Sequence, residues 1–497
     1  MSALTSRRPD LGANRAALPL VVALLTYAAV IAAGPRILDD PDTFLHVAVG
    51  QWIIAHGVPH ADVFSHTMRG APWVADEWLS EVVLAFAYKS LGWEGLILVT
   101  AAAFAATLGL LARSLQRVFD PVYVLIAVVA AAGLSFPHLT ARPHVLALPL
   151  LVLWTDGLVR ARQADRAASP WLAVVIALWA NLHGSFVLGL LLALLFAGEA
   201  LYDAPDRNAL WRAARGWGVF LGLAVLASCV TPNGVAGLLL PFHLVGMTFA
   251  LAILDEWQSP NFQELQPVEF WLLLVLLGIL SKGVRLPLTR IVMFLVLLHL
   301  ALEHKRFVEN LGLVAPLLAA PLLAPQLPRL VIPALQRAAA VADRKIAILP
   351  GLALLGALAL ALTISALRIG VTHGNGYFAP VAALDAVDRQ HVSGPVFNDL
   401  GFGSYLIFSG VPTFVDSRVE LYGDGFLRRY ETVANLPGLL TRYNITWTLL
   451  PPQNPRVAVM DLLPGWHRLY TDDFAVVHVR DATAMGAQEP QTRLGRN

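Results

Sequence analysis

The feature that most constrains this chain is a succession of apolar segments, each approaching the length needed to cross a lipid bilayer. A membrane-spanning helix needs roughly 20 mostly apolar residues, and on that criterion the sequence predicts about eleven spans. The spans are expected at residues 17–38, 92–112, 120–137, 143–160, 170–182, 185–202, 216–231, 268–282, 287–302, 307–324 and 346–368. Composition agrees, because 57% hydrophobic and 14% charged residues would leave a soluble protein little with which to cover its surface.

Charge and cysteine content exclude several classes of protein. The 35 basic and 34 acidic residues nearly cancel, and no basic run is interleaved with aromatic residues, so nucleic acid is not an expected partner. Cys229 is the only cysteine and lies in an apolar segment. One chain can therefore form neither a disulfide framework nor a thiolate metal site.

The distribution of lysine and arginine predicts the orientation of the spans, because short loops rich in these residues stay in the cytoplasm. The N-terminus carries Arg7, Arg8 and Arg15 but no small-residue cleavage site, so we expect an uncleaved first span with its N-terminus inside. The other inside loops are then also basic, at 113–117, 160–166, 206–215, 282–285 and 329–345. The outside loops are 39–81, 136–144, 181–185, 255–262, 303–307 and the tail after residue 369.

Two segments differ in character from the spans. Residues 235–253 are apolar but contain Pro241 and His243, and we expect them to lie along the outer interface. After a membrane domain at 1–369, the tail is predicted to form a small soluble α/β domain at 370–482 and a disordered end at 483–497. Its strands are expected at 395–398, 412–417, 445–450 and 474–479. Asp416 and Arg418 are predicted either to form an ion pair that holds a loop or to contact a substrate.

The first outside loop, residues 39–81, holds more polar chemistry than a connector between two apolar helices requires. It contains seven carboxylates and four histidines, so it is the leading candidate for the working surface. Asp40 before Pro41 has the form of a helix cap, while Asp42 and His46 stand four residues apart on one face of the helix that follows. A carboxylate beside an imidazole can act as a base or bind a metal. The alternative is that Asp42 is a first-turn acid and His46 a packed, hydrogen-bonded residue.

Further polar residues stand at the ends of other spans. Asp76 and Glu77 open a helix, where capping explains them as well as function does. Arg142, His144 and His183 flank spans, and a charge at membrane depth either faces a cavity or anchors the helix at the interface.

Two outside loops near the later spans also carry charge. Glu256 lies in the loop at 255–262. His304, Lys305 and Arg306 form an outward basic cluster that departs from the positive-inside tendency. An anionic ligand and a lipid headgroup explain this cluster equally well.

These features together resemble the GT-C superfamily of integral membrane glycosyltransferases. The shared features are an apolar first helix, a loop opening with Asp39, Asp40 and Asp42, an interfacial helix, about eleven spans and an outer C-terminal domain. Segments such as DPDTFLHVAVGQWI, WVADEWL, NLHGSF and EWQSPNF are also similar to a group of bacterial predicted membrane proteins. The resemblance implies a membrane all-α bundle with a small C-terminal α/β domain. It also implies a multi-pass protein of the bacterial inner membrane, with the C-terminal domain in the periplasm.

The resemblance further implies transfer of a sugar from a polyprenyl-phosphate donor to a glycan or lipid acceptor on the outer side. By that analogy the base is Asp42, with Asp40 next. The departing phosphate needs a cation, which is either a divalent metal (Mg or Mn) held by Asp42 and His46, or a basic group of Arg142, Lys305 or Arg306. The residues expected to bind substrate are His46, Glu77, Arg142, His144, His183, Glu256, His304 and Arg306.

Two other classes of protein stay open on the sequence. A transporter would use Arg142 and His183 along a pathway, but it would more often show inverted repeats, and none is evident. A noncatalytic scaffold or envelope-polymer binding protein with a glycosyltransferase-like body is the third alternative.

Overall fold

The computed structural model describes residues 14–328, 345–371 and 374–481. The chain divides into two compact units that are each formed from separate stretches of sequence. The helical unit is drawn from residues 1–38, 87–241 and 254–370, and the mixed unit from 39–86, 242–253 and 371–497. Three expectations lie outside the described residues: the basic N-terminus, most of the basic segment at 329–345, and the disordered end at 483–497.

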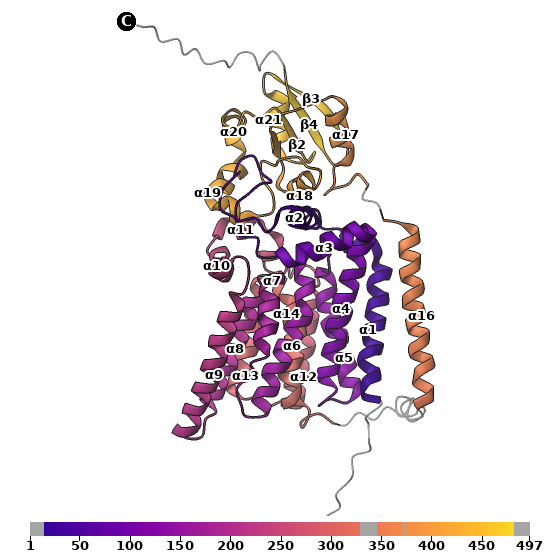
Figure 1. Ribbon diagram of the computed structural model, residues 1–497, viewed down its shortest axis with the longest axis vertical. Helices are drawn as coiled ribbons and strands as arrows, with labels where there is room; N and C mark the ends of the chain where they lie inside the picture. The colour runs from indigo at the N-terminus through magenta and orange to yellow at the C-terminus, as the bar shows by residue number, and fades with distance from the viewer. Residues whose placement is uncertain (1–13, 329–344, 372–373, 482–497) are drawn as a thin grey trace, which may run out of the picture. The chain divides into compact units, whose positions relative to one another are not determined.

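The helical unit is a bundle in which every predicted span contains one helix, of 11 to 25 residues (Figure 1). Its helices are α1 (Asn14–Ala33), α4 (Trp93–Leu115), α5 (Pro121–Ser135), α6 (Pro143–Gln163), α7 (Leu172–Leu182), α8 (Phe186–Tyr202), α9 (Arg207–Ser228), α12 (Pro267–Lys282), α13 (Leu288–Glu303), α14 (Val308–Leu323) and α16 (Lys345–Ile369). In chain order, α1 packs on α4 and α16, α4 on α6, and both α7 and α8 on α9. Short 3-10 turns flank some of them: η1 (Gly34–Leu38) follows α1, η2 (Phe136–His138) lies between α5 and α6, η3 (Asp255–Trp257) precedes α12, and η4 (Lys305–Phe307) lies between α13 and α14.

Apolar length identifies the chain as a membrane protein. Within the described residues, seven segments are long and apolar enough to cross a bilayer. They are Ala17–Leu38, Trp93–Leu115, Pro121–His138, Pro143–Gln163, Arg207–Ser228, Lys305–Leu323 and Pro350–Ile369. The total of about eleven crossings stays a prediction.

The sequence sets where several of these helices begin and end. Pro121, Pro143 and Pro267 are each the first residue of a helix, a position that suits the fixed φ and missing N–H of proline. The Asp206 carboxylate caps α9 by accepting from the Ala209 N–H at 2.7 Å. Gly283 ends α12 in the left-handed conformation, at φ 59°.

Several buried charged residues of the bundle are paired. Arg290 donates from Nε to Glu199 Oε1 at 2.7 Å, and its guanidinium lies 4.7 Å from the ring centroid of Phe196. Arg117 and Arg160 both contact the Asp156 carboxylate, at 2.7 and 3.0 Å. Because an unpaired charge is costly to bury, such pairing is what the apolar surroundings require.

The segment at 235–253 folds as two short helices, α10 (Gly234–Val245) and α11 (Thr248–Ile253). The longer of them has 12 residues, about 18 Å of helix, whereas a bilayer core is about 30 Å thick. Within the mixed unit, the Asp424 carboxylate accepts from the Phe249 and Ala250 N–H groups at 3.0 Å. Because α10 has 12 residues and α11 has 6, neither helix is long enough to cross a bilayer.

The mixed unit contains a four-stranded sheet in the order β1-β2-β4-β3. Its strands are β1 (Val396–Asn398), β2 (Trp447–Leu450), β3 (Trp466–Thr471) and β4 (Val476–Arg480). The helix α17 (Val381–Arg389) precedes the first strand. The helices α18 (Leu400–Phe408), α19 (Val419–Glu431), α20 (Leu436–Arg442) and α21 (Pro455–Leu462) follow it. β1 and β2 run parallel, while β4 is antiparallel to both β2 and β3. The predicted α/β character of this region is confirmed.

One expected strand, residues 412–417, is not a strand. Thr413 forms only an isolated bridge with Ser65. The neighbouring backbone is instead satisfied by the Asn398 side chain, which accepts from Phe414 N–H at 2.8 Å and donates to the Val415 carbonyl at 2.7 Å. The prediction was wrong because a side chain and a distant loop supply the hydrogen bonds that a strand partner would have supplied.

The first loop is an integral part of the mixed unit. It forms α2 (Asp42–His56) and the start of α3 (Trp78–Leu91). The ring of Phe44 on α2 lies 5.1 Å from Tyr405 and 5.5 Å from Phe408, both on α18. Beyond α2, the Thr67 hydroxyl donates to the Phe414 carbonyl at 2.6 Å. The interfacial helix predicted after Asp40 is therefore packed on the C-terminal fold.

A buried ion-pair network, which we call the clasp, joins the loop to that fold. Arg418 donates to both oxygens of Asp416 at 2.7 Å and approaches Asp62 of the first loop at 2.8 Å. All three side chains are at most 4% exposed, and the Arg418 guanidinium lies 4.6 Å from the Trp73 ring centroid. The ion-pair interpretation of Asp416 and Arg418 is confirmed.

Candidate functional site

The residues that the sequence singles out fall into two groups, one in each unit. Six of them, from four separate segments, meet in the helical unit, and we call this group the arginine cluster: Arg142, His144, His183, Glu256, His304 and Arg306. The other four lie at the start of the first loop and α3, and we call them the acidic loop: Asp40, Asp42, His46 and Glu77.

The centre of the arginine cluster is one carboxylate shared by two guanidinium groups. Arg142, directly before α6, donates from Nη1 to Glu256 Oε2 at 3.1 Å. Arg306, in η4, donates from Nη1 to the other oxygen, Oε1, also at 3.1 Å. The Glu256 side chain thereby links two cations that come from distant parts of the sequence.

The electrostatics of the cluster follow from this sharing. Burial alone would raise the pKa of Glu256, but the Arg306 and Arg142 charges outweigh it and lower that pKa to about 2. The Glu256 carboxylate is therefore ionised at neutral pH. The Arg306 side chain is 27% exposed, and its guanidinium lies 4.5 Å from the Trp257 ring centroid.

Several contacts hold η3 and η4 together and so position Glu256 and Arg306. The Lys305 N–H donates to the Gln258 carbonyl at 2.9 Å, and the Lys305 ammonium pairs with Asp255 at 2.6 Å. His304 Nδ1 lies 2.7 Å from the Trp257 carbonyl, which makes Nδ1 the protonated nitrogen. The structure thus gives His304 a positioning contact rather than an open ring nitrogen at Nδ1.

The two remaining histidines lie beside each other, with ring centroids 6.2 Å apart. His144 Nε2 lies 3.2 Å from the His138 carbonyl and 3.9 Å from Glu309. His183 Nδ1 accepts from the Ser185 N–H at 3.1 Å. Burial, followed by the Arg306 charge, lowers the pKa of His183 well below its usual value. His183 is therefore neutral at physiological pH, with its proton on Nε2.

In the acidic loop, the two aspartates have different structural positions. The Asp40 Oδ1 accepts from the Asp42 N–H at 2.9 Å, and the Asp40 carbonyl accepts from the Thr43 N–H at 3.3 Å. Asp40 thus holds the start of α2 through its side chain, although the helix begins one residue later than the sequence predicts, with Pro41 in the cap position. Asp42 is the first residue of the helix itself.

His46 lies on α2 facing two glutamates that precede and begin α3. Its Nδ1 is 3.3 Å from Glu81 Oε1 and 3.8 Å from Glu77 Oε2. Gly50 permits this close approach of the helices, because a Cβ at residue 50 would lie 2.0 Å from the Glu81 carbonyl oxygen. Burial raises the pKa of Glu81 above its usual value, although the His46 hydrogen bond opposes the shift.

The metal expectation is not confirmed. Among the described residues, no group of three or more histidine, cysteine, aspartate or glutamate side chains is placed to hold a metal ion. Asp42 and His46, the expected ligands, belong to no such group.

Sequence reasoning missed three residues that the structure adds to these groups. Glu81 pairs with His46, Trp257 stacks on Arg306, and Glu309 approaches His144. Two of them carried a signal in the sequence. Glu81 follows Glu77 by four residues, which places both on one helix face, and Glu309 is an acid in the first turn of an apolar span.

Comparison with known proteins shows what the fold resembles. No protein-family model matches the sequence, and no curated protein matches it significantly. Among solved structures, the apo oligosaccharyltransferase of Archaeoglobus fulgidus superposes with a TM-score of 0.52 at 12% identity, covering 89% of this chain and 70% of that one. Apo ArnT from Cupriavidus metallidurans superposes with a TM-score of 0.51 at 14% identity, covering 95% of this chain and 98% of ArnT. The chain therefore has a GT-C-like fold, with a helical membrane body and a small mixed α/β unit.

Proposed function

We propose that this protein is a membrane glycosyltransferase that moves a sugar from a polyprenyl-phosphate donor to an envelope glycan or lipid acceptor. The GT-C-like fold supports the reaction class, and the solved structures that resemble the chain include a protein named as an oligosaccharyltransferase. The loops that carry the arginine cluster alternate along the chain with the basic loops, and this alternation supports a reaction on the outer face of the membrane.

The observation that carries the proposal is the geometry of Arg306. Among the described residues it uses Nη1 for Glu256 and its face for Trp257, and its side chain is 27% exposed. Its Nε and Nη2 hydrogens are available to an oxyanion, and a guanidinium binds two phosphate oxygens in parallel. Arg306 therefore holds the donor phosphate, with Arg142 as the second cation.

The reaction requires one proton acceptor and one stabilised leaving group. The acceptor hydroxyl oxygen attacks the anomeric carbon of the sugar, and the bond from that carbon to the phosphate oxygen breaks. The hydroxyl proton passes to the Asp42 carboxylate, and the polyprenyl phosphate leaves with the electron pair and gains negative charge. Since phosphate is a good leaving group, no separate general acid is needed. Arg306 and Arg142 stabilise the charge as it develops.

The remaining residues bind or position. Glu256 keeps the two arginines at a fixed separation and keeps them oriented. Asp40 holds the turn that presents Asp42, and is the second candidate for the base. His46 and Glu77 bind sugar hydroxyl groups, with Glu81 fixing the His46 ring. His144 and His183 bind substrate, His183 as a neutral ring, and His304 positions η3 against η4.

The proposal includes a location. The protein lies in the bacterial inner membrane with its N-terminus in the cytoplasm and the mixed unit in the periplasm. Cys229 is the only cysteine, so a Cys229→Ser background allows a single new cysteine to be labelled from each side. Periplasmic reagent should label a cysteine at exposed Asp39 and leave one at exposed Arg207 untouched. The reverse pattern contradicts the orientation.

Sugar transfer from a synthetic polyprenyl-phosphate sugar tests the function. Wild-type protein in proteoliposomes should transfer the sugar, and Asp42→Asn should lose at least about 100-fold of the rate because it cannot accept the proton. Asp39→Asn is the matched control, since Asp39 is an exposed acid three residues away and should keep near wild-type activity. No transfer by wild type, or equal rates for all three proteins, favours the scaffold or transporter alternatives.

A further inference from the structure

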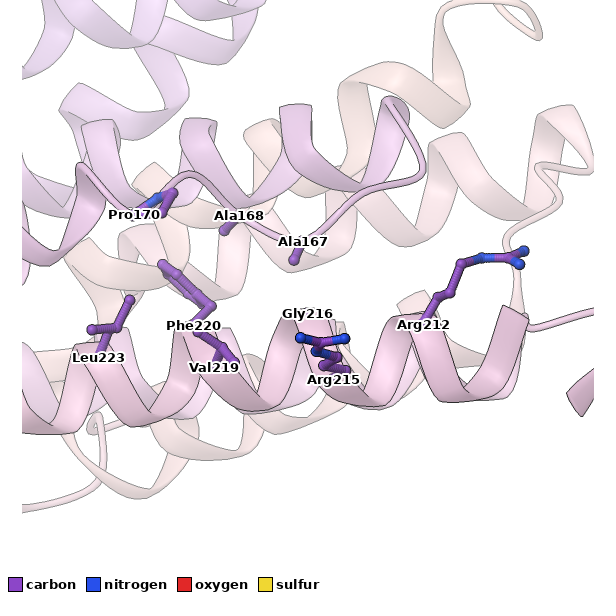
Figure 2. Close-up of a pocket in the computed structure, with 9 residues that line it drawn as sticks. All are labelled: Ala167, Ala168, Pro170, Arg212, Arg215, Gly216, Val219, Phe220 and Leu223. Carbon is purple, nitrogen blue, oxygen red and sulfur yellow. The ribbon is translucent and has the colours of Figure 1, made fainter. Parts of the chain in front are cut away.

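A pocket lies in the helical unit between α9 and the connection from α6 to α7 (Figure 2). Its volume is about 430 Å³. The side chains that line it are Ala167, Ala168, Pro170, Arg212, Arg215, Gly216, Val219, Phe220 and Leu223. None of these residues belongs to the arginine cluster or the acidic loop. Arg142 directly precedes α6, whereas the pocket lies beyond the other end of that helix, and the 21 residues of α6 span about 30 Å.

The pocket is basic at one end and apolar at the other. Arg212 and Arg215 stand three residues apart on α9, followed one to two turns later by Val219 and Leu223 on the same helix. Both arginines are exposed, and within the described part of the chain no carboxylate pairs with either side chain. Two nearby acids are engaged elsewhere: Asp206 caps α9, and Asp203 pairs with Arg162 at 2.8 Å.

The floor of the pocket is buried and packed. Phe220 is 2% exposed, and its ring lies 5.5 Å from that of the buried Trp154. Gly216 lets α9 approach the connection closely, since a Cβ there would lie 3.0 Å from the Ala167 Cβ. The crevice is therefore bounded by a fixed helix face on one side and by Ala167–Pro170 on the other (Figure 2).

Exposed aromatic residues near the pocket are typical of the depth of the lipid headgroups. Trp171 follows the pocket's loop, Trp211 adjoins Arg212, and Tyr202 ends α8. Their exposed fractions are 50%, 65% and 69%. Tryptophan and tyrosine gather at the boundary between hydrocarbon and water, where their amphipathic rings suit both sides. At this depth, a ligand that joins an anion to an acyl chain meets both ends of the pocket.

We propose that the pocket binds an anionic phospholipid of the membrane. The phosphate lies between the guanidinium groups of Arg212 and Arg215, which can each donate two parallel hydrogen bonds. The headgroup fills the crevice above Phe220, and an acyl chain continues along the exposed side chains of Val219 and Leu223, which are 58% and 38% exposed. Basic pockets between membrane helices on the cytoplasmic side suit such headgroups.

Binding is tested on the full-length protein, purified and stripped of lipid, by native mass spectrometry and thermal stability. Phosphatidylglycerol should stay bound and raise the unfolding temperature, whereas phosphatidylcholine and soluble glycerol 3-phosphate should do neither. The double variant Arg212→Gln with Arg215→Gln should weaken phosphatidylglycerol binding by about ten-fold or more. Arg212→Lys with Arg215→Lys, which keeps the charge, should retain part of the binding.

The matched control removes the same charge outside the pocket. Arg207→Gln with Lys282→Gln changes two exposed basic residues that do not line the crevice, and it should leave the binding unchanged. Equal losses in the two double variants would overturn the proposal, because a diffuse surface charge would then explain the binding. Equal binding of phosphatidylcholine, or full stabilisation by glycerol 3-phosphate, would overturn it as well.

Discussion

The clasp of the mixed unit and the arginine cluster of the helical unit use the same chemistry under different conditions of burial. In the clasp, Arg418 meets two carboxylates and is 4% exposed. In the arginine cluster, one carboxylate meets two arginines, and Arg306 is 27% exposed. The clasp therefore has two acids for one base and is closed to solvent, whereas the arginine cluster has two bases for one acid and is partly open to solvent.

That difference separates a structural role from a binding role. Arg418 is surrounded by Asp62, Asp416, Trp73 and Phe64, so no ligand can reach it. Arg306 keeps part of its guanidinium in reach of a ligand while Glu256 and Trp257 fix its direction. Burial with more acids than bases closes a site, whereas partial exposure with more bases than acids prepares one for an anion.

Removing the clasp arginine should give the largest effect on stability. Arg418→Leu leaves Asp62 and Asp416 buried without their cation, and breaking a buried pair in this way costs about 3 to 5 kcal/mol. Thermal unfolding and limited proteolysis of the full-length protein should both show loosening of residues 39–86 and 374–481 together. Arg429→Gln is the control, because Arg429 is exposed on the same α19 helix. A clasp variant as stable as this control would refute the structural assignment.

Removing Arg306 should have the opposite pattern of effects, with a large loss of sugar transfer and a small change in stability. Arg306→Gln deletes the donor for the leaving phosphate, so we expect sugar transfer to fall about 100-fold. The unfolding temperature should stay within a few degrees of wild type, since the side chain is partly exposed. Isothermal titration calorimetry with a polyprenyl phosphate then shows whether Arg306 contacts the phosphate or only supports the fold: the Arg306→Gln variant should bind the phosphate more weakly than wild type. A large loss of stability with normal phosphate binding would place Arg306 with Arg418 as a structural residue.

The two units should also respond to pH in opposite senses through Glu256 and Glu81. The pKa of Glu256 is lowered to about 2, so the stability that it contributes is present above its unfolded value near 4.5 and is lost as the pH falls towards 2. The pKa of Glu81 is raised, so the folded state is progressively disfavoured as the pH rises above 4.5. Glu256→Gln should therefore flatten the acid limb of the stability profile, and Glu81→Gln should gain stability relative to wild type above pH 4.5. Identical profiles for both variants would contradict this assignment.

The sequence was sufficient to predict the helices, because an apolar run of this length can satisfy its backbone in a membrane in few other ways. It was weaker in the mixed unit. Residues 412–417 have the composition of a strand, but their partners are the Asn398 side chain and the distant Ser65. β3 was not predicted because it is a partly exposed edge strand, WHRLYT, and its polar residues do not show the alternation of apolar and polar side chains that is typical of a strand.

The site was predictable in its members but not in its grouping. Arg142, Glu256 and Arg306 stood out as charges beside apolar spans, and the structure brings them to one carboxylate. No spacing in the sequence relates residues 114 or 50 positions apart, since only the packing of η3 against η4 and the start of α6 defines that contact. The pairing of His46 with Glu81 likewise depends on the close approach at Gly50.

The smallest effect is expected where a charge of the same cluster is exposed. Lys305 pairs with Asp255 at 2.6 Å, but Asp255 is 87% exposed, and a surface pair of this kind contributes about 0 to 1 kcal/mol. Lys305→Gln should leave the unfolding temperature almost unchanged and lower sugar transfer by less than about three-fold, because the Lys305 N–H still holds η4 to the Gln258 carbonyl. Comparing the sugar-transfer rates of Lys305→Gln and Arg306→Gln shows whether the cluster acts through one oriented guanidinium group or through its total positive charge. A loss as large as that of Arg306→Gln would mean that total charge matters, and the contrast with the clasp would then rest on burial alone.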